Sequence, residues 1–206
     1  MQSWRVIAYH VEIKERIKYC ADVLNKRYAN KKVVMICVLK GAVFFYVDLL
    51  RSLTIPYSCY FVGASSYLDG QIAGAIKVDF VVEPSKFTDR EVIIVDELYD
   101  NGHTLEKVTQ AISKEASVPL DKIYTCTLFW KYKIGVIGPN LYGLVVPNVW
   151  LVGYGLDDKQ EKRGLVDLWA VPKEPGVTET EDDQLFTDDV VYKQIRSQIL
   201  ERVGLL

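Results

Sequence analysis

The segment from Val92 to Thr104 places the strongest constraint on what this chain can fold into. It opens with four β-branched apolar residues, Val92 to Val95, and such a run is typical of a buried strand. Two adjacent acids, Asp96 and Glu97, follow directly. We therefore expect a buried strand that ends in a pair of carboxylates.

A glycine-containing turn and a helix come next. Asp100 and Gly102 mark the turn, and apolar residues recur at helical spacing over 105–117. The start of a helix offers free N–H groups and a positive dipole end, which suit a phosphate. The paired carboxylates suit ribose hydroxyls or a divalent metal. The segment therefore predicts an anion-binding site, although an ordinary α/β domain with a capping Asp would share the local pattern.

A second strand–turn–helix unit precedes this one. Residues 33–39 are continuously apolar, Lys40 and Gly41 end the run, and 42–53 has helical periodicity. Such units build parallel sheets. Because ligands bind beyond the carboxyl ends of parallel strands, the polar residues at those ends should converge.

The other segments complete an α/β fold of about five mostly parallel strands with helices on both faces, and a small hood formed by residues 1–30 and the last third. We expect a helix over 11–29, strands over 57–64, 75–82, 123–130, 150–153 and 165–171, a short apolar run over 141–146, and a flap over 65–74. Residues 1–206 are expected to form one domain. Within 172–206, an acidic linker precedes helical periodicity over 190–203.

Charge and cysteine usage narrow the class of protein. The net charge is −2, which argues against a nucleic-acid binder with a large basic face. The four cysteines are scattered without a CxxC pair, so neither a zinc site nor a disulfide framework is expected. No signal-peptide pattern and no apolar run of membrane-spanning length is present. We expect a soluble, cytoplasmic protein without a membrane partner.

The segment from Val92 to Thr104 resembles the phosphoribosyl-diphosphate signature of the type I phosphoribosyltransferases. That signature consists of apolar residues, two acids, two spacers, an acid, a small residue, Gly, any residue and Thr. Two residues depart from it. Asn101 stands where the family has a small or hydroxyl residue, and the bulky Tyr99 lies inside the expected turn.

Further segments resemble the 6-oxopurine (hypoxanthine-guanine) phosphoribosyltransferases over about residues 32–171. Leu39-Lys40-Gly41 is similar to their pyrophosphate loop, and Ser66-Tyr67 to their catalytic flap. Lys131 matches their purine-reading lysine, and residues 150–157 match their base-stacking aromatic, Val-Gly-Tyr and acid. The Leu39–Lys40 peptide is often cis in that family.

The resemblance implies a role for each matched residue. Asp100 would be the general base near the purine N7, and Lys131 would donate to O6. Trp150 would stack on the purine, while Leu151 and Asp157 would line the base. Phosphoribosyl diphosphate would be bound by Leu39, Lys40, Gly41, Asp96, Glu97, Asp100, Asn101, Gly102, His103, Thr104 and Arg163.

The implied reaction joins guanine or hypoxanthine to phosphoribosyl diphosphate and releases pyrophosphate. Mg²⁺ is the implied cofactor, held by Asp96, Glu97 and Asp157, and the implied assembly is a homodimer. Closure of Ser66-Tyr67 would exclude water. Two alternatives stay open: an enzyme for xanthine or another base, and a non-catalytic regulator that kept the phosphoribosyl-binding fold.

Overall fold

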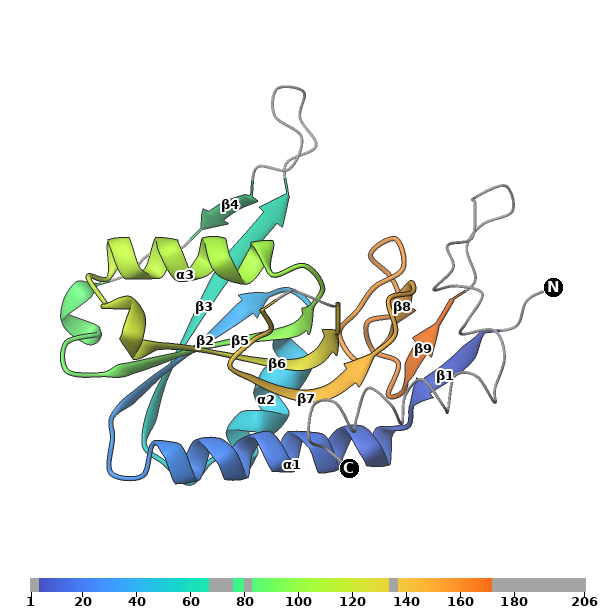
Figure 1. Ribbon diagram of the computed structural model, residues 1–206, viewed down its shortest axis with the longest axis horizontal. Helices are drawn as coiled ribbons and strands as arrows, with labels where there is room; N and C mark the ends of the chain where they lie inside the picture. Colours follow the sequence, from blue (N-terminus) through green and yellow to red (C-terminus); the bar gives the residue numbers. More distant parts are fainter. Residues whose placement is uncertain (1–3, 67–75, 80–82, 134–136, 172–206) are drawn as a thin grey trace.

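A six-stranded sheet forms the centre of the molecule in the computed structural model, which describes residues 4–66, 76–79, 83–133 and 137–171 (Figure 1). The strand order is β4-β3-β2-β5-β6-β7, and all neighbours are parallel except β4, which is antiparallel to β3. The five parallel strands confirm the predicted sheet. The bounds are β2 (Val33–Leu39), β3 (Tyr57–Ser66), β4 (Ile76–Asp79), β5 (Glu91–Tyr99), β6 (Ile123–Lys131) and β7 (Leu141–Val146).

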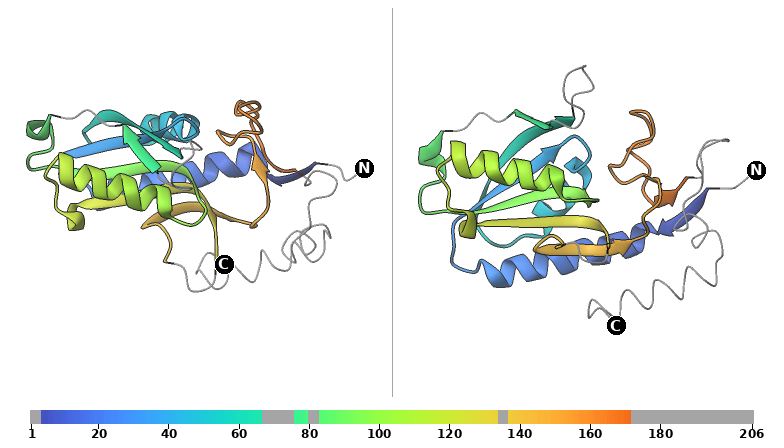
Figure 2. Two further views of the ribbon diagram at one scale, coloured as in Figure 1. Left: turned by 90° about the horizontal axis from the view of Figure 1, so that it is seen from above. Right: turned by 45° about the horizontal axis from the view of Figure 1, so that its top comes forward.

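Helices cover both faces of this sheet, as predicted (Figure 1 and Figure 2). α1 (His10–Arg27) and α2 (Val43–Ser52) pack on one face, and α3 (His103–Glu115) packs on the other. Alternate residues of β5 enter the two cores: Ile93 faces α1 and α2, whereas Ile94 faces α3. The short 3-10 helices η1 (Pro84–Lys86) and η2 (Leu120–Lys122) precede β5 and β6.

A small antiparallel sheet forms the hood. Its order is β1-β9-β8, with β1 (Arg5–Ala8), β8 (Leu151–Val152) and β9 (Leu168–Ala170). It lies beyond the end of the main sheet to which β6 and β7 point (Figure 1). The expectation that residues 1–30 all belong to the hood was wrong. Only β1 does, because the buried stripe of α1 around Ile13 and Ile17 joins the main core.

Several strand and helix ends differ from the predicted ones. β5 runs through its two acids to Tyr99, because Leu98 and Tyr99 still pair with β6. Tyr99 is therefore a strand residue and was wrongly placed in the turn. α3 begins at His103 and ends before Ser117, which has a positive φ of 54°. β8 and β9 are shorter than predicted, whereas the described part of the strand predicted over 75–82 is β4.

Some expectations fall outside the described residues. They concern Tyr67 and most of the flap, and the acidic linker and helix within 172–206. Ser66 is described as the last residue of β3, paired with Ile76. No helix among the described residues is both long and apolar enough to cross a membrane.

Candidate active site

The candidate site lies where β2, β5 and β6 end, beside the hood. The turns after these three parallel strands carry most of the residues predicted to act, as expected for the carboxyl edge of an open sheet. The hood turn that follows β8 reaches the same edge, since the carbonyl oxygen of Gly155 lies against Gly41. The site is therefore assembled from both sheets.

The turn between β5 and α3, called the phosphate turn after its predicted ligand, is built around Gly102. Gly102 is the N-cap of α3 with φ +82°, a conformation that side chains rarely adopt. The Asn101 side-chain oxygen accepts a hydrogen bond from the His103 N–H at 3.1 Å. An amide oxygen thus occupies one of the helix-start donors that an anion would use, which gives Asn101 a physical role in the turn.

Tyr99 supports this turn from the side of β5. A methyl group at Gly102 would collide with the Tyr99 hydroxyl, so ring and turn are in close contact. The same hydroxyl donates to the carbonyl oxygen of Ile137 at 2.8 Å. Tyr99 therefore links the phosphate turn to the segment that leads into β7.

The two acids of β5 are adjacent, and burial raises the pKa of both. Asp96 is only 6% exposed, and its Oδ1 accepts a hydrogen bond from the Glu97 N–H at 2.9 Å. Burial and the neighbouring Glu97 carboxylate raise the pKa of Asp96 well above its usual value. Burial also raises the pKa of Glu97, although the charge of Arg163 acts against this. A buried carboxylate beside a partly buried one favours a cationic partner.

The turn after β2 has the backbone shape that the resemblance implied. The Leu39–Lys40 peptide is cis. Gly41 follows, and a Cβ there would overlap the Glu97 carboxyl group and come within 2.9 Å of the Gly155 carbonyl oxygen. The pyrophosphate-loop candidate, the acid pair and the hood therefore meet at a residue that has no side chain.

The hood places Asp157 and Arg163 together. The Arg163 Nη2 and Asp157 Oδ1 form an ion pair of 2.6 Å, and Arg163 Nη1 donates to the Gly155 carbonyl oxygen at 2.8 Å. The other Asp157 oxygen accepts the Gln160 N–H at 2.8 Å. Asp157 is thus engaged by its own loop, and its charge also acts on Glu97, whose pKa it helps to raise.

Asp100 contacts two lysines, of which only Lys131 was among the predicted site residues. Lys131 Nζ lies 3.3 Å from Oδ2, and Lys133 Nζ lies 2.8 Å from Oδ1. Burial acts to raise the pKa of Asp100, but the hydrogen bond from Lys133 and the charges of both lysines outweigh it, so the pKa lies below its usual value. Lys133 could have been found from its spacing, because residues i and i+2 of an extended chain share a side.

The predicted base-binding residues of the hood differ in exposure. Trp150 is 54% exposed, so part of its ring remains open for stacking. Leu151 is buried in β8, where its backbone pairs with β9. A stacking role for Trp150 is compatible with this exposure, and any contact from Leu151 would come from its backbone.

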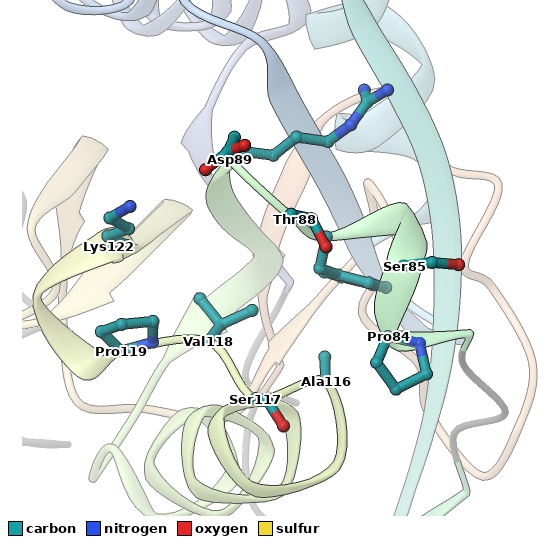
Figure 3. A pocket seen from close by; sticks show the side chains of 11 residues that line it. Pro84, Ser85, Thr88, Asp89, Ala116, Ser117, Val118, Pro119 and Lys122 are labelled. Atoms are coloured by element: carbon teal, nitrogen blue, oxygen red, sulfur yellow. The ribbon is translucent and has the colours of Figure 1, made fainter.

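A separate cleft of about 310 Å³ lies at the opposite edge of the sheet (Figure 3). Its walls come from the segment around η1 and from the segment between α3 and β6, and include Pro84, Asp89, Ser117 and Lys122. These segments precede β5 and β6, whereas the residues described above follow them. The cleft is therefore not part of the candidate site.

Comparison with known proteins agrees with this arrangement. The model of the phosphoribosyl transferase domain matches residues 4–158. The chain belongs to the phosphoribosyltransferase family. The match includes the phosphate turn, Lys131 and the hood as far as Asp158, but ends before Arg163.

Three proteins similar to this chain are named as phosphoribosyltransferases of hypoxanthine and related purines. The hypoxanthine-guanine-xanthine phosphoribosyltransferase of Tritrichomonas foetus is 30% identical, over 78% of this chain and 87% of the relative. The hypoxanthine-guanine phosphoribosyltransferase of Lactococcus lactis is 29% identical over the same shares. The solved hypoxanthine phosphoribosyltransferase from Trypanosoma cruzi, in complex with the product IMP, has a TM-score of 0.66 and 26% identity, covering 81% and 93% of the two chains.

The carboxylates of Asp96 and Glu97 fit a Mg²⁺ ion that is also coordinated by substrate phosphates. Within the described part of the chain, no three acidic, histidine or cysteine side chains are grouped closely enough to hold a metal ion. Asp96 nevertheless presents a buried carboxylate and Glu97 a partly buried one, and Mg²⁺ is commonly bound by one or two carboxylates plus substrate phosphates. Two protein carboxylates are sufficient for that mode of binding.

Proposed function

We propose that this phosphoribosyltransferase joins a 6-oxopurine, guanine or hypoxanthine, to phosphoribosyl diphosphate and yields the nucleoside 5′-monophosphate and pyrophosphate. The proposal depends most on the contact between Asp100 and Lys131. Asp100 belongs to the phosphate turn, whereas Lys131 ends β6. A single ion pair thus joins the phosphate-binding turn to a residue suited to read a base. The named relatives support this choice of base.

The phosphoribosyl half would be held mainly by backbone groups. The N–H groups of residues 100–104, with the Thr104 hydroxyl, would bind the 5′-phosphate at the start of α3. The backbone of residues 39–41 would bind the pyrophosphate, and Arg163 would supply a permanent cation nearby. Binding would require the Asn101 oxygen to give up the His103 N–H or the phosphate to use its neighbours.

The base half would discriminate by hydrogen bonding. Lys131 donates only, so it favours the O6 of an oxopurine over the 6-amino group of adenine. Trp150 would stack on the purine ring. Asp100 would accept the N7 proton as N9 displaces pyrophosphate at the ribose C1, which develops oxocarbenium-like charge. Its carboxylate is ionised, as a general base requires.

Mg²⁺ is proposed as the cofactor, with Asp96, Glu97 and Asp157 as candidate ligands. It would neutralise the charge of the diphosphate leaving group. The carboxylates Asp96 and Glu97 would also orient the ribose hydroxyls. Ser66 and Tyr67 would begin the flap that excludes water during the reaction.

A homodimer in the cytoplasm is proposed from the resemblance alone. Size-exclusion chromatography with light scattering would test the dimer directly. A mass of about one chain at micromolar concentration would contradict it.

Nucleotide formation tests the proposed reaction. The protein would be mixed with Mg²⁺, phosphoribosyl diphosphate and each of guanine, hypoxanthine, xanthine and adenine, with orotate as an unrelated base. Product with guanine or hypoxanthine, and much less with adenine, is expected. No product with any base would refute the proposal and would favour a non-catalytic regulator.

Xanthine is a second candidate, because the name of the Tritrichomonas foetus relative includes it. The same assay separates the two, since kcat/KM for xanthine can be compared with that for guanine. A value for xanthine that equals or exceeds the guanine value would extend the substrate range to three bases.

A further inference from the structure

We propose that Lys133 is a positioning residue that holds the Asp100 carboxylate and thereby leaves Lys131 available to the base. This inference deepens the proposed function and rests on it. It assigns a task to a residue that neither the expected signature nor the resemblance singled out.

The backbone of this segment brings both lysines to one side. Trp130 and Tyr132 contact each other through their rings, with centroids 5.1 Å apart. Lys131 and Lys133 alternate with them and both reach Asp100. The extended period of two thus continues past the end of β6, and it delivers a matched pair of ammonium groups to one carboxylate.

The two ion pairs are not equivalent. Lys131 is the more buried lysine, with 10% of its side chain exposed, and its contact with Asp100 is the longer one at 3.3 Å. Lys133 is 33% exposed and makes the shorter contact at 2.8 Å. Lys133 is therefore the main counter-ion of Asp100, and Lys131 is the lysine that is less firmly held.

Each lysine engages a different oxygen of Asp100. Lys133 contacts Oδ1 and Lys131 contacts Oδ2, which fixes the plane of the carboxylate. A carboxylate has about four acceptor positions, so two remain for a proton from the base. Lys131 has three donors and can keep its contact while it binds O6.

Loss of Lys133 should therefore strengthen the contact between Lys131 and Asp100, at the expense of the contact between Lys131 and the base. With one cation removed, Lys131 becomes the sole partner of Asp100 among the described side chains that contact it, and it is drawn away from the base. The carboxylate also loses the contact that fixes its plane. Binding of the base is weakened, whereas binding of phosphoribosyl diphosphate depends on other groups.

Steady-state kinetics of Lys133→Met would show this split. We expect the KM for guanine or hypoxanthine to rise roughly three-fold, as for the loss of a partly exposed ion pair, with the KM for phosphoribosyl diphosphate unchanged. Lys133→Arg should restore most of the base KM, because it keeps the charge. The matched control is Lys18→Met, which removes a 3.0 Å pair with Asp22 on α1. An unchanged base KM in Lys133→Met would overturn the proposal.

A double-mutant cycle gives a readout that does not depend on activity. Lys133→Met should lower the melting temperature by about 1–3 °C in the native background and by less in the Asp100→Asn background. Equal losses in both would refute the contact. A native protein that is inactive with every base would refute only the proposed reaction, and the cycle would still decide whether Lys133 holds Asp100.

Discussion

The Tyr99 hydroxyl donates a hydrogen bond to the carbonyl oxygen of Ile137, and the two atoms are 2.8 Å apart. This contact connects the last residue of β5 to the segment before β7. The same ring lies against Gly102, the cap of α3. One tyrosine thus braces the phosphate turn against a neighbouring segment, at a position where the related signature has only a spacer.

Tyr99→Phe should remove this hydrogen bond and keep the ring. We expect a loss of about 0.5–1 kcal/mol in the free energy of unfolding, measured by urea denaturation, because the bond is partly exposed. Tyr9→Phe is the control, since Tyr9 is 64% exposed and removal of its hydroxyl should change the free energy of unfolding less. A Tyr99→Phe protein as stable as the native one would show that the bond is not maintained in solution.

Gly102→Ala should damage the phosphate turn. Its φ of +82° is unfavourable for alanine, and the added methyl would overlap the Tyr99 hydroxyl. We expect a loss of at least about 1 kcal/mol in stability and a higher KM for phosphoribosyl diphosphate. Gly164→Ala is a matched control, because nothing lies within 4 Å of its Cβ position. Similar effects of the two substitutions would contradict a special conformation at Gly102.

Asp100→Asn should reduce turnover while leaving phosphoribosyl diphosphate bound. An amide of the same size cannot accept the N7 proton, so kcat should fall about 10²–10⁴-fold. Calorimetric titration with phosphoribosyl diphosphate and Mg²⁺ should give a nearly native affinity. Asp121→Asn, at the opposite edge of the sheet in η2, should change neither quantity. Full turnover in Asp100→Asn would remove this residue from the role of general base.

Metal removal should abolish activity but not stability. The described residues lack a grouped ligand set, so the metal is expected to bind together with the diphosphate. EDTA should stop nucleotide formation, and excess Mg²⁺ should restore it. The melting temperature should rise when Mg²⁺ and phosphoribosyl diphosphate are added together, by mass action, but not with Mg²⁺ alone. A clear rise with Mg²⁺ alone would reveal a preformed metal site.

The ion pairs of Asp100 with Lys131 and Lys133 should contribute less to stability as the pH falls. The lysines hold the pKa of Asp100 below its usual value of 3.8, so the folded state favours the ionised form. Its stabilisation is therefore present above about pH 5 and is lost as the pH falls through the folded pKa. The difference in melting temperature between native protein and Lys133→Met should be constant from about pH 5 to 8 and shrink below pH 4. A difference that disappears near pH 6 would point to another group.

The main sheet could be predicted because its central strands are continuous runs of apolar residues. Residues 33–39 and 92–95 belong to strands that are covered on both faces, so their sequences are apolar throughout and do not alternate with polar residues. The order of turns along the chain then located most candidate residues. Burial also explains why β5 was ended too early: Asp96 is a charged residue inside a strand, which local pattern alone does not predict.

Contacts between distant segments could not be predicted in the same way. The spacing of Lys131 and Lys133 predicts that they share a side, but it does not predict that Asp100, in the turn after the neighbouring strand β5, contacts both. Tyr99 was placed in the turn, since its partner Ile137 lies in another segment and carries no recognisable signal. The division of residues 1–30 between hood and body likewise depended on which core α1 joins.

The contact between Gly41 and Gly155 has a consequence for how such a chain can change. The two residues touch through backbone atoms, with no side chain that could shrink, grow or rotate to absorb a shift. The turn proposed for pyrophosphate and the hood proposed for the base therefore share one wall. If the proposed roles hold, a substitution at Trp150 or Lys131 would alter the choice of base without changing this contact, whereas an insertion in either turn would shift both proposed binding sites. The close approach of Gly41 and Gly155 would therefore fix the spacing between the two proposed sites more tightly than the choice of base.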